Sequence, residues 1–302
     1  MQYAGHKICK INNKDKFNLD QKPDIYFLEV NASNKCNLKC RMCNGSVSTS
    51  WLSEEKKIKE MGFNGDRGGE HLYKKMNDKT LNGLFDNKEN FRNLKYLSLR
   101  GGEPFVEDYN FKIMDKLIEW GCSKNIILDV STNGTVINSK LINYFKSFKE
   151  VELYISLEGV GSAYQYIRGG ENFSVGILEE NIKMLRDVSN VTPIFTITTM
   201  IYNIGEIVNI WNWFKGIREP GDEISFSNTV VKPEYLNYQI LPKEIKEQFL
   251  DNIMASDLPV KEYDTGKRIL RDVGIPSIID GLRKENYYES DKILKLRGLF
   301  KS

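Results

Sequence analysis

The chain has 302 residues, of which 40% are hydrophobic, so it can form one large domain with an appendage or two small domains. Its 43 Lys and Arg residues nearly balance 41 Asp and Glu residues, and the net charge of +2 gives no electrostatic basis for binding nucleic acid. No run of about 18 apolar residues occurs, and the first residues lack the apolar segment of a signal peptide, so we expect no membrane contact and a cytoplasmic location.

From residue 24 onward, short strand-like runs alternate with longer helical patterns. The predicted strands are residues 25–30, 94–99, 125–130, 151–157, 192–201 and 223–231. Helical spacing is found between them, at residues 111–120, 139–148, 178–188 and 207–214. This alternation is typical of βαβ units around a parallel sheet. We therefore predict an α/β fold, a partial (β/α)6 TIM-like barrel with a small, mainly helical C-terminal extension.

The pattern divides the chain into three parts. Residues 1–24 form an N-terminal extension, and residues 25–232 form the partial-barrel core. Within the core, the insertion 46–93 is expected to contain one or two helices and a lid over the substrate, or to be a surface insertion without function. Residues 233–302 form the helical C-terminal extension, which we expect to act as a lid over the barrel mouth.

Three cysteines, Cys36, Cys40 and Cys43, follow the first predicted strand with C-x3-C-x2-C spacing. Three thiolates on one tight loop can hold three irons of a cubane cluster and leave the fourth iron open, whereas a cluster that only carries electrons usually has four cysteine ligands. A closed zinc site also needs four ligands, and the two histidines, His6 and His71, are not spaced to complete one. A disulfide does not explain three clustered cysteines in a chain without a secretory signal.

A second motif, Gly101-Gly102-Glu103-Pro104, ends the second predicted strand about sixty residues later. In combination, the cysteine spacing and this Gly-Gly-Glu motif resemble the radical S-adenosylmethionine (SAM) superfamily over about residues 25–232. The resemblance implies a SAM-type [4Fe–4S] cluster and a glycine backbone close to SAM. The glycines permit close approach of a ligand, and both the exposed backbone and the Glu103 carboxylate can accept hydrogen bonds from the SAM ammonium group.

The cysteine run is most similar to the SPASM/twitch branch of the superfamily, whose extra C-terminal cysteines bind an auxiliary cluster. Here no cysteine follows Cys122, so we predict one cluster, held by Cys36, Cys40 and Cys43. Met42 stands where the family often has an aromatic residue next to the adenine, and its thioether can pack there or simply within the loop.

Further SAM contacts are implied by the resemblance at the ends of later strands. Ser131, Thr132 and Asn133 end the third strand, where the family contacts the ribose or the methionyl part of SAM. The alternative for such residues is a turn or a surface salt bridge. Because the carboxyl ends of parallel strands form the site in α/β folds, the positions of these residues agree with the predicted fold.

Ser156 and Glu158 end the fourth strand, where related enzymes have a Ser-Leu-Asp-Gly type of motif, so Glu158 replaces the usual Asp. Arg168 is expected to pair with the SAM carboxylate through its guanidinium fork. Asn203 and Val230, after or near the ends of the fifth and sixth strands, are candidates for contact with adenine or ribose; a turn cap and core packing are their alternatives.

The resemblance implies a radical SAM enzyme in which the reduced cluster cleaves SAM to a 5′-deoxyadenosyl radical that removes a hydrogen atom from a substrate. We expect a small molecule (a sugar, nucleotide or amino acid derivative), with a peptide as alternative, and an external one-electron reductant of the flavodoxin or ferredoxin type. An oxidoreductase, isomerase or lyase outcome is left open, because a fold hosts many reactions. The rival hypothesis is a non-catalytic iron–sulfur sensor or electron carrier, with Cys9, Cys122 or an outside molecule as fourth ligand.

Overall fold

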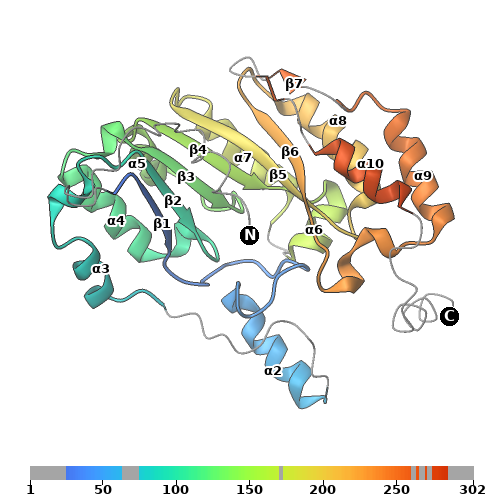
Figure 1. Ribbon diagram of the computed structural model, residues 1–302, viewed down its shortest axis with the longest axis horizontal. Coiled ribbons are helices and arrows are strands. Elements are labelled where there is room, and N and C mark those ends of the chain that lie inside the picture. The colour runs from blue at the N-terminus through green and yellow to red at the C-terminus, as the bar shows by residue number, and fades with distance from the viewer. Residues whose placement is uncertain are drawn as a thin grey trace, which may run out of the picture.

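A six-stranded parallel sheet forms the centre of the computed structural model, which describes residues 25–62, 75–169, 173–259, 263–264, 269–270 and 274–284. The strands lie side by side in chain order: β1 (Phe27–Asn31), β2 (Tyr96–Arg100), β3 (Ile127–Thr132), β4 (Glu150–Ser156), β5 (Val191–Thr199) and β6 (Glu223–Thr229). Among the described strands β1 and β6 do not pair, so the sheet stays open (Figure 1). The predicted α/β fold with a partial TIM-like barrel is confirmed.

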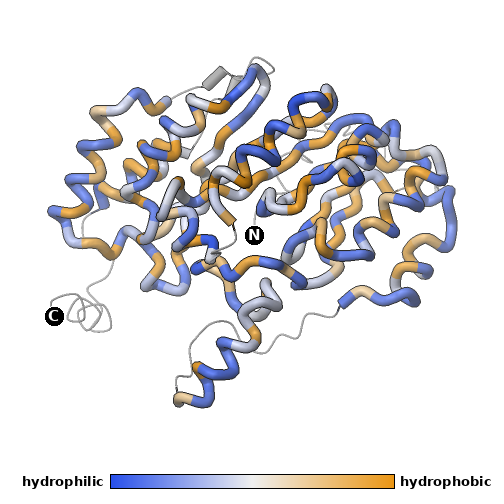
Figure 2. The backbone as a smooth tube through the Cα atoms, turned by 180° about the vertical axis from the view of Figure 1, so that it is seen from behind, coloured by the Kyte–Doolittle hydropathy of each residue, from blue (hydrophilic) through white to orange (hydrophobic). Residues whose placement is uncertain are grey.

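Helices cross over between consecutive strands and cover one face of the sheet (Figures 1 and 2). They are α4 (Asp108–Glu119), α5 (Ser139–Lys146), α6 (Gly161–Arg168), α7 (Val175–Leu185) and α8 (Ile207–Ile217). Seen from behind in Figure 2, these helices carry both hydrophobic and hydrophilic residues, as amphipathic helices on a sheet do.

Strand alternation gives the sheet two different faces. The helix side is apolar, and its residues in register belong to the buried core: Leu97, Leu128 and Val151. Shifting by one residue along each strand gives a polar row that runs across five strands in register: Glu29, Ser98, Asp129, Glu152 and Thr192. Because successive side chains point to opposite faces, this row lies on the inner face of the partial barrel.

The chain after β6 packs at the β6 edge of the sheet. Helices α9 (Lys243–Met254) and α10 (Ile275–Arg283) contact one another, and α10 also contacts β6 (Figure 1). The buried Lys246 of α9 donates through Nζ to the carbonyl oxygen of Lys284, just after α10, at 2.7 Å. A short antiparallel pair, β7 (Tyr263–Asp264) and β8 (Ile269–Leu270), lies between these helices in the sequence. The role of the extension as a lid remains a prediction.

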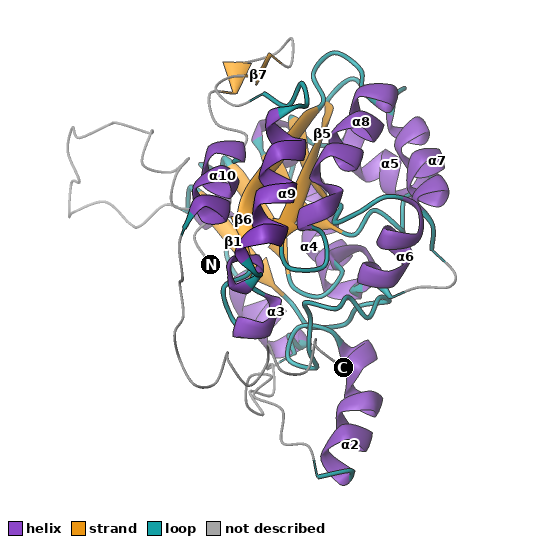
Figure 3. Ribbon diagram, turned by 90° about the vertical axis from the view of Figure 1, so that its right-hand side faces the viewer, coloured by secondary structure: helices purple, strands orange, loops and turns teal. Residues whose placement is uncertain are grey.

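The predicted insertion contains two helices, α2 (Leu52–Glu60) and α3 (Asp78–Leu84). Figures 1 and 3 show α2 extending away from the sheet and its helices, and none of its residues is buried. Residues 63–74, with His71, lie outside the described residues, as do residues 1–24 with His6 and Cys9. No helix in the described part of the chain is long and apolar enough to cross a bilayer.

Candidate functional site

The predicted site residues meet at the carboxyl ends of the strands. The cysteine loop, defined here as residues 34–44, follows β1, and the Gly-Gly-Glu motif follows β2 beside it. Helix α6, which the sequence patterns did not predict, comes after β4 and reaches the same loop through its last turn. Its eight residues begin with Gly161 and have no side-chain N-cap, so local sequence gives little indication of a helix.

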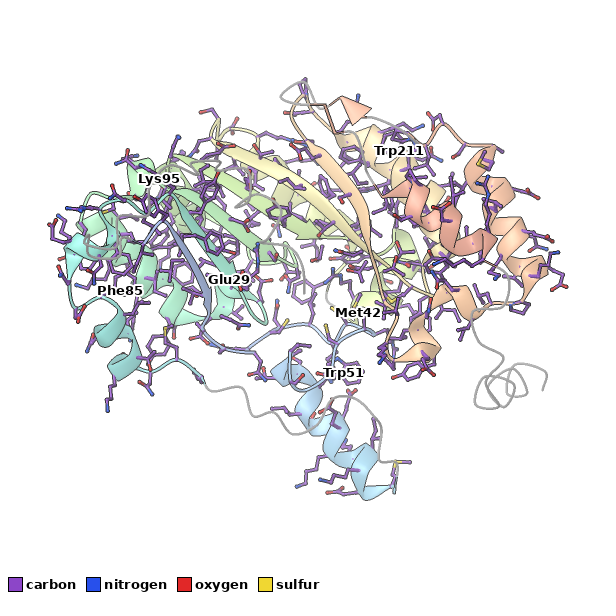
Figure 4. The ribbon with its side chains drawn as sticks, in the orientation of Figure 1. Glu29, Met42, Trp51, Phe85, Lys95 and Trp211 are labelled. Carbon is purple, nitrogen blue, oxygen red and sulfur yellow. The ribbon has the colours of Figure 1, made fainter. Side chains whose placement is uncertain are left out.

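Hydrogen bonds from the segment just downstream hold the cysteine loop. The hydroxyls of Ser48 and Ser50 donate to the carbonyl oxygens of Leu38 and Cys36, each at 2.7 Å. The buried indole of Trp51 donates through Nε1 to the carbonyl oxygen of Cys40 at 3.1 Å. Figure 4 shows Trp51 at the start of α2, on the same side of the molecule as Met42 of the loop. These bonds use backbone acceptors of the loop and leave its thiols for other partners.

Two glycines allow neighbouring backbone to close on the loop from either side. Gly102 packs against Lys35, and Glu103 N–H donates to the Lys35 carbonyl oxygen at 2.8 Å. On the other side, Gly169 ends α6 in the left-handed conformation (φ 71°) and packs against Lys39. Arg41 N–H donates to the carbonyl oxygen of Ile167 at 2.7 Å. A side chain at either glycine would overlap the loop backbone.

The Glu103 carboxylate is buried and accepts three hydrogen bonds from the protein. Its Oε1 accepts from Phe105 N–H at 3.2 Å and from the Thr132 hydroxyl at 2.8 Å, and its Oε2 accepts from Asn133 N–H at 2.7 Å. Burial raises the pKa of Glu103 to about 7, although the bonds from Asn133, Thr132 and Phe105 act in the opposite direction. Glu103 therefore links the ends of β2 and β3, rather than presenting a free carboxylate to a ligand as we expected.

Asn133 joins the third strand to the cysteine loop. Its Nδ2 donates to Asn37 Oδ1 at 2.8 Å, and Asn37 Nδ2 donates to the Thr135 hydroxyl at 2.8 Å. Thr135 in turn donates its N–H to Asn133 Oδ1 at 2.9 Å. Asn133, which is 6% exposed, thus positions Asn37, a residue of the loop between Cys36 and Cys40.

The three cysteines lie in different electrostatic surroundings. Cys40 is buried, whereas Cys36 and Cys43 are half-buried. A hydrogen bond from Cys43 lowers the pKa of Cys40 to about 7, and the Arg168 charge acts in the same direction. The same hydrogen bond raises the pKa of Cys43, and burial raises the pKa of Cys36. Of the three thiols, Cys40 is thus the one whose pKa is lowered, and it lies next to the Arg168 guanidinium.

Arg168 is paired with protein groups. One guanidinium nitrogen, Nη2, forms an ion pair with Glu158 Oε2, and Nη1 donates to Cys40 Sγ at 3.4 Å. The side chains of Arg168 and Glu158 are only 8% and 2% exposed. Burial raises the pKa of Glu158, while the Arg168 charge opposes that shift. The structure thus directs the guanidinium, expected to meet the SAM carboxylate, to a cysteine sulfur and a protein carboxylate.

The other predicted SAM contacts differ in their surroundings. Asn203 is fully buried, and its amide caps the loop after β5: Oδ1 accepts from Met200 N–H at 2.7 Å and Nδ2 donates to the Thr198 carbonyl oxygen at 3.0 Å. Val230 is half-buried and its N–H donates to the Thr199 carbonyl oxygen at 2.9 Å. The turn-cap alternative therefore describes the Asn203 side chain.

Ser131, Ser156 and Met42 remain candidates for ligand contact. All three are half-buried. Ser131 and Ser156 have the strand parity of the polar row, so they lie on the inner face, above Asp129 and Glu152.

Sequence motifs missed a polar network on the inner face. Arg100 forms an ion pair with Asp129 and lies over the Tyr154 ring at 5.8 Å. The Tyr154 hydroxyl donates to Glu152 Oε2 at 3.1 Å. Figure 4 shows Glu29 on β1, at the edge of the same row. The period-2 alternation of polar residues in the strands could have revealed this network, since buried parallel strands are ordinarily apolar on both faces.

Among the described residues, no three His, Cys, Asp or Glu side chains converge on one metal-ion position. The groups around Cys40 fit a negatively charged cluster bound through thiolates. Beside Cys40, the buried Arg168 Nε and the buried Tyr164 hydroxyl have no hydrogen-bond partner within the described structure. Three thiols, an adjacent guanidinium and unpaired buried donors match what a negatively charged, thiolate-bound cluster requires.

Comparison with solved structures shows the fold. Native anSMEcpe with bound AdoMet superposes with a TM-score of 0.52 at 18% identity, over 76% of this chain and 60% of that chain. The same protein with bound AdoMet and Kp18Cys peptide gives 0.51 at 19% identity, over 76% of this chain and 59% of that chain. Streptococcus suis SuiB bound to precursor peptide SuiA gives only 0.47 at 14% identity, over 77% and 46%. The chain thus spans about three fifths of the length of anSMEcpe.

Comparison with protein families identifies the chain. No curated protein sequence matches it. The family model described as "Radical SAM superfamily" matches residues 30–214, which include the cysteine loop, the Gly-Gly-Glu motif and strands β2 to β5. Because this match covers more than half of the 302 residues, the chain belongs to the radical SAM superfamily, whose members are enzymes that use S-adenosylmethionine and an iron–sulfur cluster.

Proposed function

We propose that Cys36, Cys40 and Cys43 hold one [4Fe–4S] cluster and that SAM binds beside it at the carboxyl edge of the sheet. The observation that carries this proposal is the cysteine loop itself, which is held between the Gly102 and Gly169 contacts and leaves three thiols as ligands. When bound, the cluster and SAM together supply the 5′-deoxyadenosyl radical that removes a hydrogen atom from the substrate.

The protein's part is to place SAM. Since the Glu103 carboxylate is occupied by Phe105, Thr132 and Asn133, we assign the SAM ammonium group to the backbone carbonyls of Gly101 and Gly102. Glu103 then acts by fixing that backbone. A carbonyl oxygen accepts from an ammonium without a desolvated negative charge in the site.

Ser131 and Ser156, on the inner face, are assigned to the ribose or methionyl part of SAM. Met42 and Val230 are assigned to the adenine, which both can contact through apolar atoms. The buried position of the Asn203 amide in its loop supports leaving its side chain out of this set.

The substrate is expected to be polar, because the inner face beneath this site carries Glu29, Arg100, Asp129, Glu152 and Tyr154. A small polar molecule and a peptide both fit that chemistry. We propose an external one-electron reductant of the flavodoxin or ferredoxin type, and the cytoplasm as the reducing compartment that an oxygen-sensitive cluster requires.

The ligand set is tested by iron content after anaerobic reconstitution. Cys36→Ala, Cys40→Ala and Cys43→Ala are each expected to lose the cluster absorbance. Cys122→Ala is the matched control, because Cys122 lies just after α4, packs against the hydrophobic core and donates its thiol to the Trp120 carbonyl oxygen at 3.9 Å. Iron loss on changing Cys122 would instead support a four-cysteine sensor or electron carrier.

A further inference from the structure

A buried ion pair lies directly against one of the proposed cluster ligands. Arg168 donates through Nη1 to Cys40 Sγ at 3.4 Å, and its Nη2 pairs with Glu158 Oε2. Both side chains are more than nine-tenths buried. Glu158 is itself held by the N–H of Thr198 on β5, at 3.4 Å to Oε1. The positive end of this pair therefore faces the sulfur, and the negative end faces the sheet.

The backbone fixes Arg168 relative to the cysteine loop on both sides. The residue before it, Ile167, accepts the N–H of Arg41 at 2.7 Å. The residue after it, Gly169, has φ 71° and packs against the backbone of Lys39. Cys40 lies between Lys39 and Arg41, so contacts on both sides hold the backbone of Arg168 next to that of Cys40.

We propose that Arg168, held in place by Glu158, is a positioning residue that acts through Cys40 to set the reduction potential of the cluster. The inference rests on the proposed function, because it requires a cluster on Cys40. The step concerned adds one electron from the external reductant to the cluster; Arg168 and Glu158 change neither bonds nor protons.

Proteins set the reduction potential of such clusters through hydrogen bonds to the sulfurs and through nearby charges. A thiolate bound to iron keeps lone pairs that accept an N–H donor. Adding an electron makes the cluster more negative, so the Arg168 donor and charge stabilise the reduced form and raise the potential. Glu158 limits that rise by neutralising the guanidinium, and in this buried setting both effects are screened weakly.

This role differs from pairing with the SAM carboxylate in one measurable respect. A residue that binds only SAM changes the affinity for SAM and leaves the SAM-free cluster unaltered. A residue that acts through Cys40 changes the potential of the cluster before SAM is added.

The test is an anaerobic redox titration of the SAM-free, reconstituted full-length protein, followed by EPR of the reduced cluster. Glu158→Gln leaves the guanidinium charge without its partner, and we expect a more positive potential than in the wild type. Arg168→Gln removes the charge and the donor to Cys40, and we expect a more negative potential. A change of about tenfold in the reduction equilibrium corresponds to about 59 mV for one electron. Opposite signs for the two variants are the result that supports the proposal.

Asp222→Asn is the matched control, because Asp222, which is buried, forms an ion pair with the partly buried Arg186 at 2.7 Å. Arg186 follows α7 and precedes β5, at the opposite edge of the parallel sheet. This variant breaks a comparable pair and is expected to leave the potential unchanged. Arg168→Lys keeps the charge without the fork, and it is expected to lie between the wild type and Arg168→Gln.

If the wild type forms its cluster but both variants have unchanged potentials, or potentials shifted in the same direction, the inference is wrong and the proposed function is unaffected. A wild type that forms no cluster would overturn the proposed function first. Loss of SAM affinity in Arg168→Gln with an unchanged potential would assign the guanidinium to SAM instead.

Discussion

Gly102 and Lys35 are in direct backbone contact: a Cβ placed on Gly102 would lie 2.6 Å from the carbonyl carbon of Lys35. Real Cβ atoms do not approach backbone this closely, so any side chain at position 102 displaces the cysteine loop. The need for glycine at position 102 therefore has a cause within the protein: the segment after β2 lies too close to the cysteine loop to leave room for a side chain. Gly169 has the same relationship to Lys39 on the other side of the loop, with a Cβ at 2.9 Å from the carbonyl carbon.

Gly169→Ala should weaken both the fold and the metal site. The left-handed conformation costs an L-residue about 1–2 kcal/mol, and the contact with Lys39 adds a steric term. We expect the free energy of unfolding to fall by about 2 kcal/mol or more, and iron content to fall with it. Chemical denaturation and iron analysis check this.

Gly121→Ala is the control for the conformational term alone, because Gly121 has φ 73° and no atom within 4 Å of a built Cβ. The free energy of unfolding of this variant should fall by about 1 kcal/mol, and its iron content should stay unchanged. Equal losses in the two variants, with iron retained in both, would show that the contact with Lys39 has no effect.

The raised pKa of Glu103 predicts that the stability of the protein depends on pH. Its pKa is raised to about 7 in the folded protein, above the ordinary value of 4.5 in the unfolded chain, so the folded state binds the extra proton between those values. The contribution of Glu103 is therefore most favourable below pH 4.5, declines as pH rises toward 7, and is constant above that. The difference between wild type and Glu103→Gln in free energy of unfolding, measured from pH 5 to 8, should change with pH in this window.

Glu103→Gln should also be less stable at every pH in that range. A glutamine has one oxygen, so it cannot accept from both Phe105 and Asn133 in the observed geometry, and one buried N–H is left unpaired at about 1–3 kcal/mol. A pH-independent difference would mean that Glu103 does not titrate as described.

Trp51→Phe tests the support of the cysteine loop. The change removes the indole donor to the Cys40 carbonyl oxygen, which is held at 3.1 Å, and it leaves that acceptor without this bond. We expect a loss of about 1–3 kcal/mol in unfolding free energy and faster release of iron to a chelator.

Trp211→Phe provides the comparison, because Trp211 is also buried and donates through Nε1, at 2.9 Å, to Asp257. It lies on α8, away from the loop (Figure 4). A similar stability loss with unchanged iron release is expected there. If both variants release iron alike, Trp51 has only a general role in stability.

The sheet and the place of the site were predictable because they follow from patterns along the chain. Alternating strands and helices gave all six strands within a few residues, and the cysteine loop and the Gly-Gly-Glu motif lie after β1 and β2, as predicted. Helix α6 was missed, since a helix of eight residues that begins at Gly161 without a cap depends on tertiary contacts, such as its buried Tyr164 and Ile167, that local sequence does not show.

Side-chain partners were not predictable, because they depend on contacts between distant segments. Arg168 and Cys40 are 128 residues apart in the sequence, and nothing local shows that the guanidinium turns toward the sulfur. Likewise, the Thr132 and Asn133 donors reach Glu103 only when β2 and β3 pair. For Asn203 the local pattern supported a turn cap as well as a ligand contact, and only its burial distinguishes them.

The central claim is that the three cysteines support radical formation from SAM. The most direct measurement is 5′-deoxyadenosine formation, by mass spectrometry, after anaerobic reconstitution and addition of SAM and dithionite. We expect the product from the wild type and from Cys122→Ala, and none from Cys40→Ala. A wild type that carries its cluster and binds SAM but forms no 5′-deoxyadenosine, or a Cys40→Ala variant that forms as much as the wild type, would contradict the account.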